Sequence, residues 1–294
     1  MNVDEILGNR NTRYLGVGYK NANYKIVDLN LASSEALVKV SFGNEIWSIK
    51  QGTARPPHLS TLDSIVVASM VVEQILGVAE SSNYYVSHFD IRAGSVPIEL
   101  RDSLKVEFSQ NDNNYHFNIL GMKINLVIKP TTKLNYPVAG RESFLTQHLK
   151  NSKLTIDDIK SIGQTILVGV ALKKVTATDY LGLGSITSSS FSIYEWLIIF
   201  SQIGEMLTYQ LDNLHRNDCA NLWMKRISAD YHEQSNPRQA TSVMGEVIKS
   251  RVIEKDGHRW RTLTAHGSDI NNQVYFSAQM AHELPQGRGG DSNE

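Results

Sequence analysis

Two stretches of the chain are apolar almost all the way round a helix. The first runs from Leu59 to Leu76 and the second from Phe191 to Leu207. At a constant offset of 132 positions (195 − 63 = 132), three polar residues recur unchanged: Ser60, Ser69 and Glu73 return as Ser192, Ser201 and Glu205. Since the offset is close to half of the 294 residues, the pattern predicts two equivalent units packed into one body, with any active site where they meet.

Short segments rich in β-branched and aromatic residues flank both helices and predict strands. In the first half they lie at 13–20, 24–31, 36–43 and 46–52 before the helix, and at 84–93, 103–110 and 115–130 after it. In the second half they lie at 162–180 before the helix, and at 221–231, 242–257, 258–270 and 274–284 after it. A polar region over 133–160, with a short helix at 141–149, joins the halves. The order of elements therefore repeats along with the helix.

A helix that lacks a wide polar face must be wrapped by other structure. The pattern predicts an α+β fold, a tandem (double) hotdog in which each half is a curved antiparallel sheet wrapped round one long central helix. An αβ-plait and a β-barrel with peripheral helices are the alternatives. We expect a first unit with its N-terminal strands and linker over 1–150, a second unit over 151–284, and a disordered tail over 285–294, which has little to bury.

Composition narrows the classes of function. The net charge of -1 gives no field to attract nucleic acid. A single cysteine, Cys219, excludes an internal disulfide and a cysteine-rich metal cluster. The polar N-terminus has no signal-peptide pattern, and no apolar run approaches the roughly 20 residues of a membrane span, so we expect a cytoplasmic protein. Motifs for nucleotide, zinc or serine-hydrolase chemistry are missing, so no cofactor and no metal is expected.

Acidic residues on these apolar helices are the first candidates for chemistry, because burying an unpaired carboxylate is costly. Asp63 and Glu195 each lie three residues after a serine, which is the spacing of a capping box. Capping and catalysis are compatible, since a helix N-terminus also stabilises an anion. At helical spacing Met70 shares a stripe with Asp63, and Gln202 shares the matching stripe with Glu195. These stripes line a tunnel for an apolar tail, or else they are plain core.

The two halves differ in the turn before each helix. Arg55-Pro56-Pro57-His58 precedes the first helix, whereas a run of serines precedes the second. His58 has the chemistry of a general base at neutral pH, and Arg55 that of a bidentate anion ligand; a surface histidine bonded to backbone is the alternative for His58. Asp90 and Arg92 project with His88 from one strand face, either as a polar cluster at the interface of the halves or as a solvated outer face.

Three motifs resemble the avirulence D protein family over about 13–284. They are RPPHLSTLDSIVVAS (55–69), SSSFSIYEWLIIFSQIGEML (188–207) and NLWMKRIS (221–228). The resemblance implies an enzyme of signal synthesis, because those proteins direct the formation of syringolides, acyl glycosides built from a β-ketoacyl chain and D-xylulose. The family is also similar to A-factor synthases, which join a β-ketoacyl thioester to a three-carbon phosphate sugar through hotdog domains. It supplies no catalytic residue set.

From this resemblance we expect acyl transfer from a β-ketoacyl thioester, carried on a carrier protein or coenzyme A, to a small sugar. His58 is the expected base, Asp63 or Glu195 orients it or the sugar, and Arg55 binds a polar group. A dehydratase or thioesterase, and a non-catalytic acyl-lactone binding protein, are the alternatives; the dehydratase arrangement is in doubt because Ile198, four residues before Gln202, is not acidic. A homodimer of the double unit is an alternative to a monomer.

Overall fold

The computed structural model describes residues 1–43, 47–94, 96–100, 102–132, 142–175, 179–219, 222–233 and 238–285. Its helices are α1 (Val3–Leu7), α2 (Thr61–Leu76), α3 (Val78–Ser81), α4 (Leu149–Asn151) and α5 (Ile193–Leu211). Short 3-10 or π turns are η1 (Arg10–Thr12), η2 (Gly18–Asn21), η3 (Phe144–His148), η4 (Ser185–Thr187) and η5 (Arg216–Asp218).

The first half contains β1 (Ala22–Asn30), β2 (Glu35–Phe42), β3 (Ser48–Lys50), β4 (Thr53–Arg55), β5 (Tyr84–Arg92), β6 (Leu104–Asn111), β7 (Asn114–Ile119) and β8 (Met122–Pro130). After β9 (Glu142–Ser143), the second half contains β10 (Ser152–Ile162), β11 (Ile166–Val175), β12 (Tyr180–Leu181), β13 (Leu222–Tyr231), β14 (Ala240–Lys255), β15 (His258–Asp269) and β16 (Val274–Glu283).

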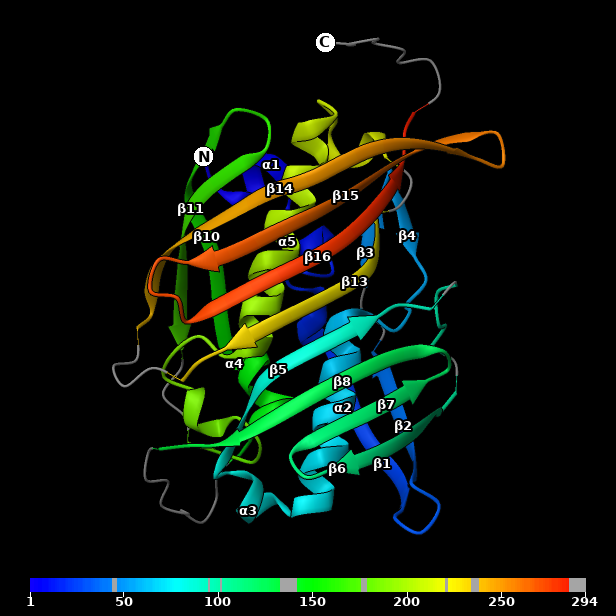
Figure 1. The fold of residues 1–294 in the computed structure, drawn as a ribbon, viewed down its shortest axis with the longest axis vertical. Coiled ribbons are helices and arrows are strands. Elements are labelled where there is room, and N and C mark those ends of the chain that lie inside the picture. The colour runs from blue at the N-terminus through cyan, green and yellow to red at the C-terminus, as the bar shows by residue number, and fades with distance from the viewer. Residues whose placement is uncertain are drawn as a thin grey trace.

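Twelve of these strands form one antiparallel sheet in the order β1-β2-β6-β7-β8-β5-β13-β16-β15-β14-β11-β10. The first six come from the first half and the last six from the second half. The two half-sheets join where β5 pairs antiparallel with β13, with Ile91 opposite Ile227. Figure 1 shows the sheet curving round α2 in its lower half and round α5 in its upper half.

Both central helices are buried because they are apolar on every side. In α5, 16 of the 19 residues are buried, including Trp196. Ser60 and Ser192 start the two helices, and each forms a complete capping box with the acid three residues later. The predicted α+β double hotdog, with one long helix in each half, is therefore confirmed.

Two predicted elements are wrong. The segment 13–20 forms turns rather than a strand, because its glycines allow backbone to pack closely: a Cβ on Gly16 would lie 2.2 Å from the Arg10 carbonyl oxygen, and one on Gly18 would lie 2.5 Å from that of Trp47. The region expected to be a polar linker to residue 160 contains β10, whose alternation buries Leu154 and Ile156 between polar residues. Two of the predicted strands also need revision in detail, since 115–130 is a hairpin of β7 and β8 and 162–180 holds β11.

The division of the chain stays a proposal. We propose units over 1–150 and 151–284, with the adjustment that residues 142–151 pack against the second half through His148. Most of the tail predicted to be disordered lies outside the described residues. Within them, no helix is long and apolar enough to cross a membrane.

Candidate active site

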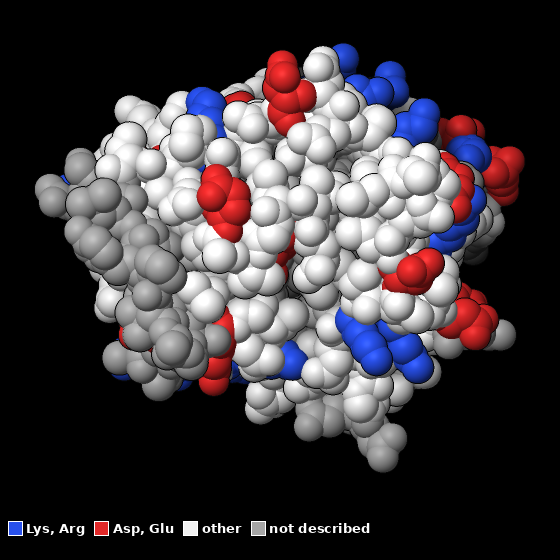
Figure 2. Space-filling view, turned by 90° about the horizontal axis from the view of Figure 1, so that it is seen from below, with Lys and Arg blue, Asp and Glu red and all other residues white. Residues whose placement is uncertain are grey.

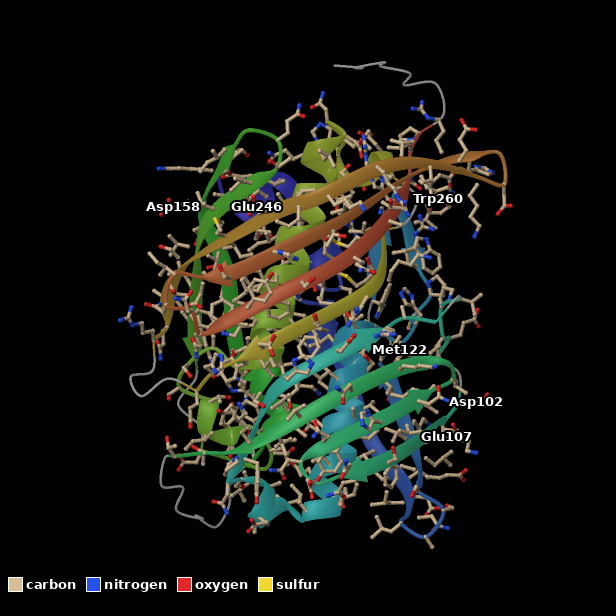
Figure 3. The ribbon with its side chains drawn as sticks, in the orientation of Figure 1. Asp102, Glu107, Met122, Asp158, Glu246 and Trp260 are labelled. Carbon is tan, nitrogen blue, oxygen red and sulfur yellow. The ribbon has the colours of Figure 1, made fainter. Side chains whose placement is uncertain are left out.

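A cavity of about 450 Å³ lies where the start of α2, the middle of α5 and the β5–β13 seam come together. Apolar side chains from the sheet side line one part of it, among them Met122, Leu222 and Met224. Met122 begins β8 near the middle of the molecule (Figure 3). Polar side chains line the rest: Arg13, Tyr14, Trp47, Lys50, Arg55, His58, Ser201, Glu205 and Arg216. The cavity thus combines residues from both halves.

The turn before α2 brings Arg55 and His58 to this cavity. The backbone holds the turn in place, since the Leu59 amide donates to the Ile98 carbonyl at 2.8 Å. His58 Nδ1 lies 3.4 Å from the Pro56 carbonyl oxygen. Because a carbonyl only accepts, Nδ1 is assigned the proton and Nε2 keeps its lone pair. Burial lowers the pKa of His58, so its ring is neutral near pH 7 and can act as a base.

Helix α5 contributes Ser201 and Glu205, which are one turn apart and share a face of the helix. Glu205 Oε1 lies 3.3 Å from Arg216 Nε and accepts a hydrogen bond from the Tyr209 hydroxyl at 3.1 Å. Helix α5 thus brings to the cavity a carboxyl group that Arg216 and Tyr209 hold in place.

Cations outnumber acids around the cavity. The four cationic side chains are Arg13, Lys50, Arg55 and Arg216, whereas the acids are Glu99 and Glu205. Burial lowers the pKa of Arg13 and Lys50. Lys50 Nζ donates to the Tyr209 hydroxyl over a long 3.4 Å contact. Among the described residues, no carboxylate oxygen pairs with Lys50 within 4.0 Å, and the Glu205 carboxylate pairs with Arg216 instead. This surplus of positive charge favours a ligand rich in oxygen atoms or carrying negative charge.

Asp63 lies behind the cavity rather than in its wall. Its Oδ1 accepts hydrogen bonds from the hydroxyls of Tyr14 at 2.7 Å and Tyr24 at 2.6 Å. Its Oδ2 accepts from the Ser60 amide at 3.1 Å. Burial raises the pKa of Asp63, and these donors oppose that rise. Tyr14 and Ser60 line the cavity and connect Asp63 to it.

Glu195 occupies the equivalent position in the second half, but it lies in a separate buried cluster. Its Oε1 is 3.1 Å from His148 Nε2, and its Oε2 is 2.9 Å from Lys173 Nζ. Burial alone raises the pKa of Glu195, but Lys173 and His148 more than offset it and hold the carboxyl below its usual range. Glu195 does not line the cavity, so the structure separates it from His58.

The remaining predicted binding residues also lie away from the cavity wall. Met70 is half-buried and packs against the core, and Gln202 uses Oε1 to accept from Arg13 Nη1 at 2.9 Å. Asp90 and Arg92 line an open groove on the sheet instead. There Asp90 accepts from Arg226 Nε at 3.0 Å across the seam between the halves. Of the predicted site residues, the structure brings only Arg55 and His58 to the cavity.

The sequence pattern missed most of the polar cavity residues. Arg13, Lys50 and Arg216 come from three separate segments and carry no common spacing that would have linked them. Ser201 and Glu205 did carry a signal, because both repeat residues of the first helix unchanged. Among the described residues, no group of three or more His, Cys, Asp or Glu side chains could hold a metal ion.

Comparison with known protein families gives a match over most of the chain. A family model described as Pseudomonas avirulence D protein (AvrD) matches residues 1–109 and 134–285. Comparison with curated proteins found no match.

Among solved structures, the tesB protein MAP1729c of Mycobacterium avium subs paratuberculosis aligns with a TM-score of 0.50 and 8% identity, covering 92% of this chain and 100% of that chain. An acyl-CoA thioesterase II, TesB2, from Mycobacterium marinum aligns with a TM-score of 0.47 and 8% identity, covering 92% and 99%. The dehydratase domain of RzxB from Pseudomonas fluorescens aligns with a TM-score of 0.45 and 14% identity, covering 88% and 97%. At these identities the likeness concerns the fold alone.

Proposed function

Because the chain belongs to the avirulence D (AvrD) protein family, we propose that it is a biosynthetic enzyme acting on acyl thioesters. It joins a β-ketoacyl thioester to a sugar such as xylulose and forms a syringolide-like acyl glycoside. The observation that carries this proposal is the cavity in which His58 and Arg55 of the first half face Ser201 and Glu205 of the second half.

The lining of the cavity supports two different substrates in one site. The apolar side chains from the sheet, with Val96 and Ile98 beside them, suit an acyl chain. The polar side chains, including Lys50 and Arg216, suit the hydroxyl groups of a sugar. The thioester is carried on a carrier protein or on coenzyme A.

His58 supplies the base in this mechanism. Its Nε2 takes the proton from a sugar hydroxyl while that oxygen attacks the thioester carbonyl carbon and forms the new C–O bond. When the tetrahedral intermediate collapses, the C–S bond breaks, and the proton on Nε2 passes to the departing thiolate. The start of α2 lies at the cavity, where its N-terminal amides and positive dipole end stabilise the oxyanion. Arg55 binds a polar group of the substrate.

A dehydratase is the second candidate, and one observation favours it. His58 and Glu205 come from different halves and line the same cavity. They form a histidine and acid pair like that of a dehydratase, although position 198, where the acid was sought, is an isoleucine. Against it, Glu205 Oε1 is already engaged by Arg216 and Tyr209 rather than free to contact a substrate hydroxyl. A thioesterase would need no sugar.

The substitution His58→Ala tests the catalytic assignment. We expect a loss of about 10²- to 10⁴-fold in kcat for sugar-dependent thiol release, the range for removal of a general base. In the wild type, kcat/KM should fall only at a pH below about 6.5, because burial lowers the pKa of His58 and only its neutral form is active. Release of thiol from a 3-oxooctanoyl thioester with D-xylulose measures both quantities.

The matched control is His88→Ala, since His88 lies on the sheet and pairs with Asp230 rather than lining the cavity. It should retain wild-type turnover. Unchanged kcat in folded His58→Ala protein would remove His58 from the mechanism.

A further inference from the structure

Ser201 has a buried hydroxyl with no hydrogen-bond partner among the described residues. It is 5% exposed and lies in the middle of α5. A serine or threonine in a helix commonly donates back to a carbonyl of the preceding turn. Thr208 does so on the same helix, with its Oγ1 2.7 Å from the Gly204 carbonyl oxygen. Ser201 forgoes this bond, and it lines the cavity.

Trp47, which also lines the cavity, carries a second unpartnered donor. Its indole Nε1 is buried and lacks a partner among the described residues, and the side chain is 8% exposed. The ring is fixed between two others: its centroid lies 4.9 Å from that of Tyr14 and 4.3 Å from that of His58. A buried N–H without an acceptor is rare in native structures, and here it lies beside the proposed base.

The repeated copy of Ser201 provides an internal comparison. Ser69 occupies the equivalent position in α2, where its hydroxyl oxygen accepts from the Tyr194 hydroxyl at 2.9 Å. One turn later, Glu73 accepts from the Leu183 amide at 2.9 Å, in place of the Arg216 contact of Glu205. The protein itself therefore satisfies the polar pair in one half and leaves the serine unsatisfied in the other.

We propose that Ser201 Oγ and the Trp47 indole N–H form a subsite that binds an oxygen atom of the sugar substrate. Two unpartnered donors on residues that line one cavity suit an acceptor such as a carbonyl or hydroxyl oxygen. The sugar fits better than the acyl chain, because Ser201 shares a helix face with Glu205. Glu205 pairs with Arg216, so this part of the cavity lining is polar. In the first half, Tyr194 already occupies the equivalent serine, Ser69. This assignment rests on the proposed function for the identity of the ligand.

Calorimetric titration of D-xylulose and, separately, of 3-oxooctanoyl coenzyme A tests the subsite. For Ser201→Ala we expect about tenfold weaker binding of D-xylulose, the effect of one lost hydrogen bond. Binding of the thioester should stay within about twofold of wild type, and the melting temperature should not fall, because the hydroxyl has no protein partner to lose.

Ser69→Ala is the matched control. It should lower the melting temperature by removing the partner of Tyr194 and leave both affinities unchanged. A second pair separates loss of the indole N–H from loss of bulk: Trp47→Phe should weaken D-xylulose binding, whereas Trp196→Phe should not, since Trp196 Nε1 is also unpartnered but lies outside the cavity.

The outcomes distinguish this subsite from the proposed function. Wild-type affinity for D-xylulose in folded Ser201→Ala and Trp47→Phe proteins overturns the subsite and leaves the proposed function standing. A wild-type protein that binds the thioester but not D-xylulose overturns both the sugar acceptor and the subsite. Equal weakening by Ser69→Ala and Ser201→Ala overturns the assignment to the cavity.

Discussion

The carboxylates at the starts of the two central helices have the same place in the repeat but different partners. Asp63 is held by the uncharged hydroxyls of Tyr14 and Tyr24, whereas Glu195 is held by Lys173 and His148. A buried charge needs compensation, and the two halves provide it by neutral donors in one case and by an ion pair in the other. Sequence spacing predicts the cap but not the form of compensation.

Lys173→Met tests the buried ion pair. The substitution leaves Glu195 without its cation in a site where both side chains are fully buried. We expect it to lower the free energy of unfolding by about 3–5 kcal/mol, measured by chemical denaturation.

The neighbouring Lys174→Met provides the control, because Lys174 is exposed and the next residue in the same strand. It should change stability by less than about 0.5 kcal/mol. Equal effects of the two substitutions would show that the ion pair with Glu195 does not stabilise the fold.

At the scale of elements, the helices were predictable and parts of the strands were not. The apolar circumference of α2 and α5 and the serine–acid spacing are local signals, and they gave the helix starts and the wrapping sheet. β10 alternates its few apolar residues with charged and hydroxyl residues, so its narrow buried face was hidden in a polar segment. The turns over 13–20 depend on close contacts with residue 47, which local sequence does not encode.

The candidate site follows the same division. Arg55 and His58 were predictable because the turn that holds them breaks the internal repeat. Trp47 and Lys50 come from one segment and Arg216 from another, and these reach the cavity through tertiary packing, with Arg216 donating to the Ile49 carbonyl at 2.9 Å. Residues assembled by tertiary contacts leave no mark in one sequence.

Gly182→Ala tests how the turn before α5 closes the second copy of the site. Gly182 has φ +96°, and an added Cβ would lie 1.9 Å from Glu73 Oε2. The carboxyl would have to move and would lose its hydrogen bond to the Leu183 amide. We expect about 1–3 kcal/mol more destabilisation than from Gly257→Ala, measured by chemical denaturation of both variants.

Gly257 is the appropriate reference, because it has φ +77° and nothing within 4 Å of an added Cβ. Both substitutions strain the backbone by forcing alanine to positive φ, so their difference isolates the contact with Glu73. Equal stabilities would indicate that the Glu73 carboxyl moves at no cost and that this turn does not close the site.

At the scale of the whole molecule, the two halves are joined as one sheet. Besides backbone pairing of β5 with β13, side-chain contacts cross the seam: an ion pair of Asp90 with Arg226, and a hydrogen bond between His88 Nδ1 and Asp230 Oδ1 at 2.8 Å. The described charges on the face seen in Figure 2 are interspersed, as the net charge of -1 leads one to expect. The groove that includes Asp90 and Glu107 is on the first half-sheet, and Glu107 lies below Met122 in Figure 3.

This arrangement makes the cavity a property of the assembled pair of units. Neither half contains both the proposed base and Ser201 with Glu205. The asymmetry between the turns before α2 and α5 leaves one copy open and the other closed by protein groups. Under the proposed function, both substrates bind in this cavity.

The most direct measurement is mass spectrometry of the products formed from a 3-oxooctanoyl thioester and ¹³C-labelled D-xylulose. We expect one labelled product whose mass equals the two substrates minus the free thiol, in amounts that depend on sugar concentration. Release of unlabelled 3-oxooctanoic acid at the same rate with and without sugar would rule out the sugar acceptor and identify a thioesterase.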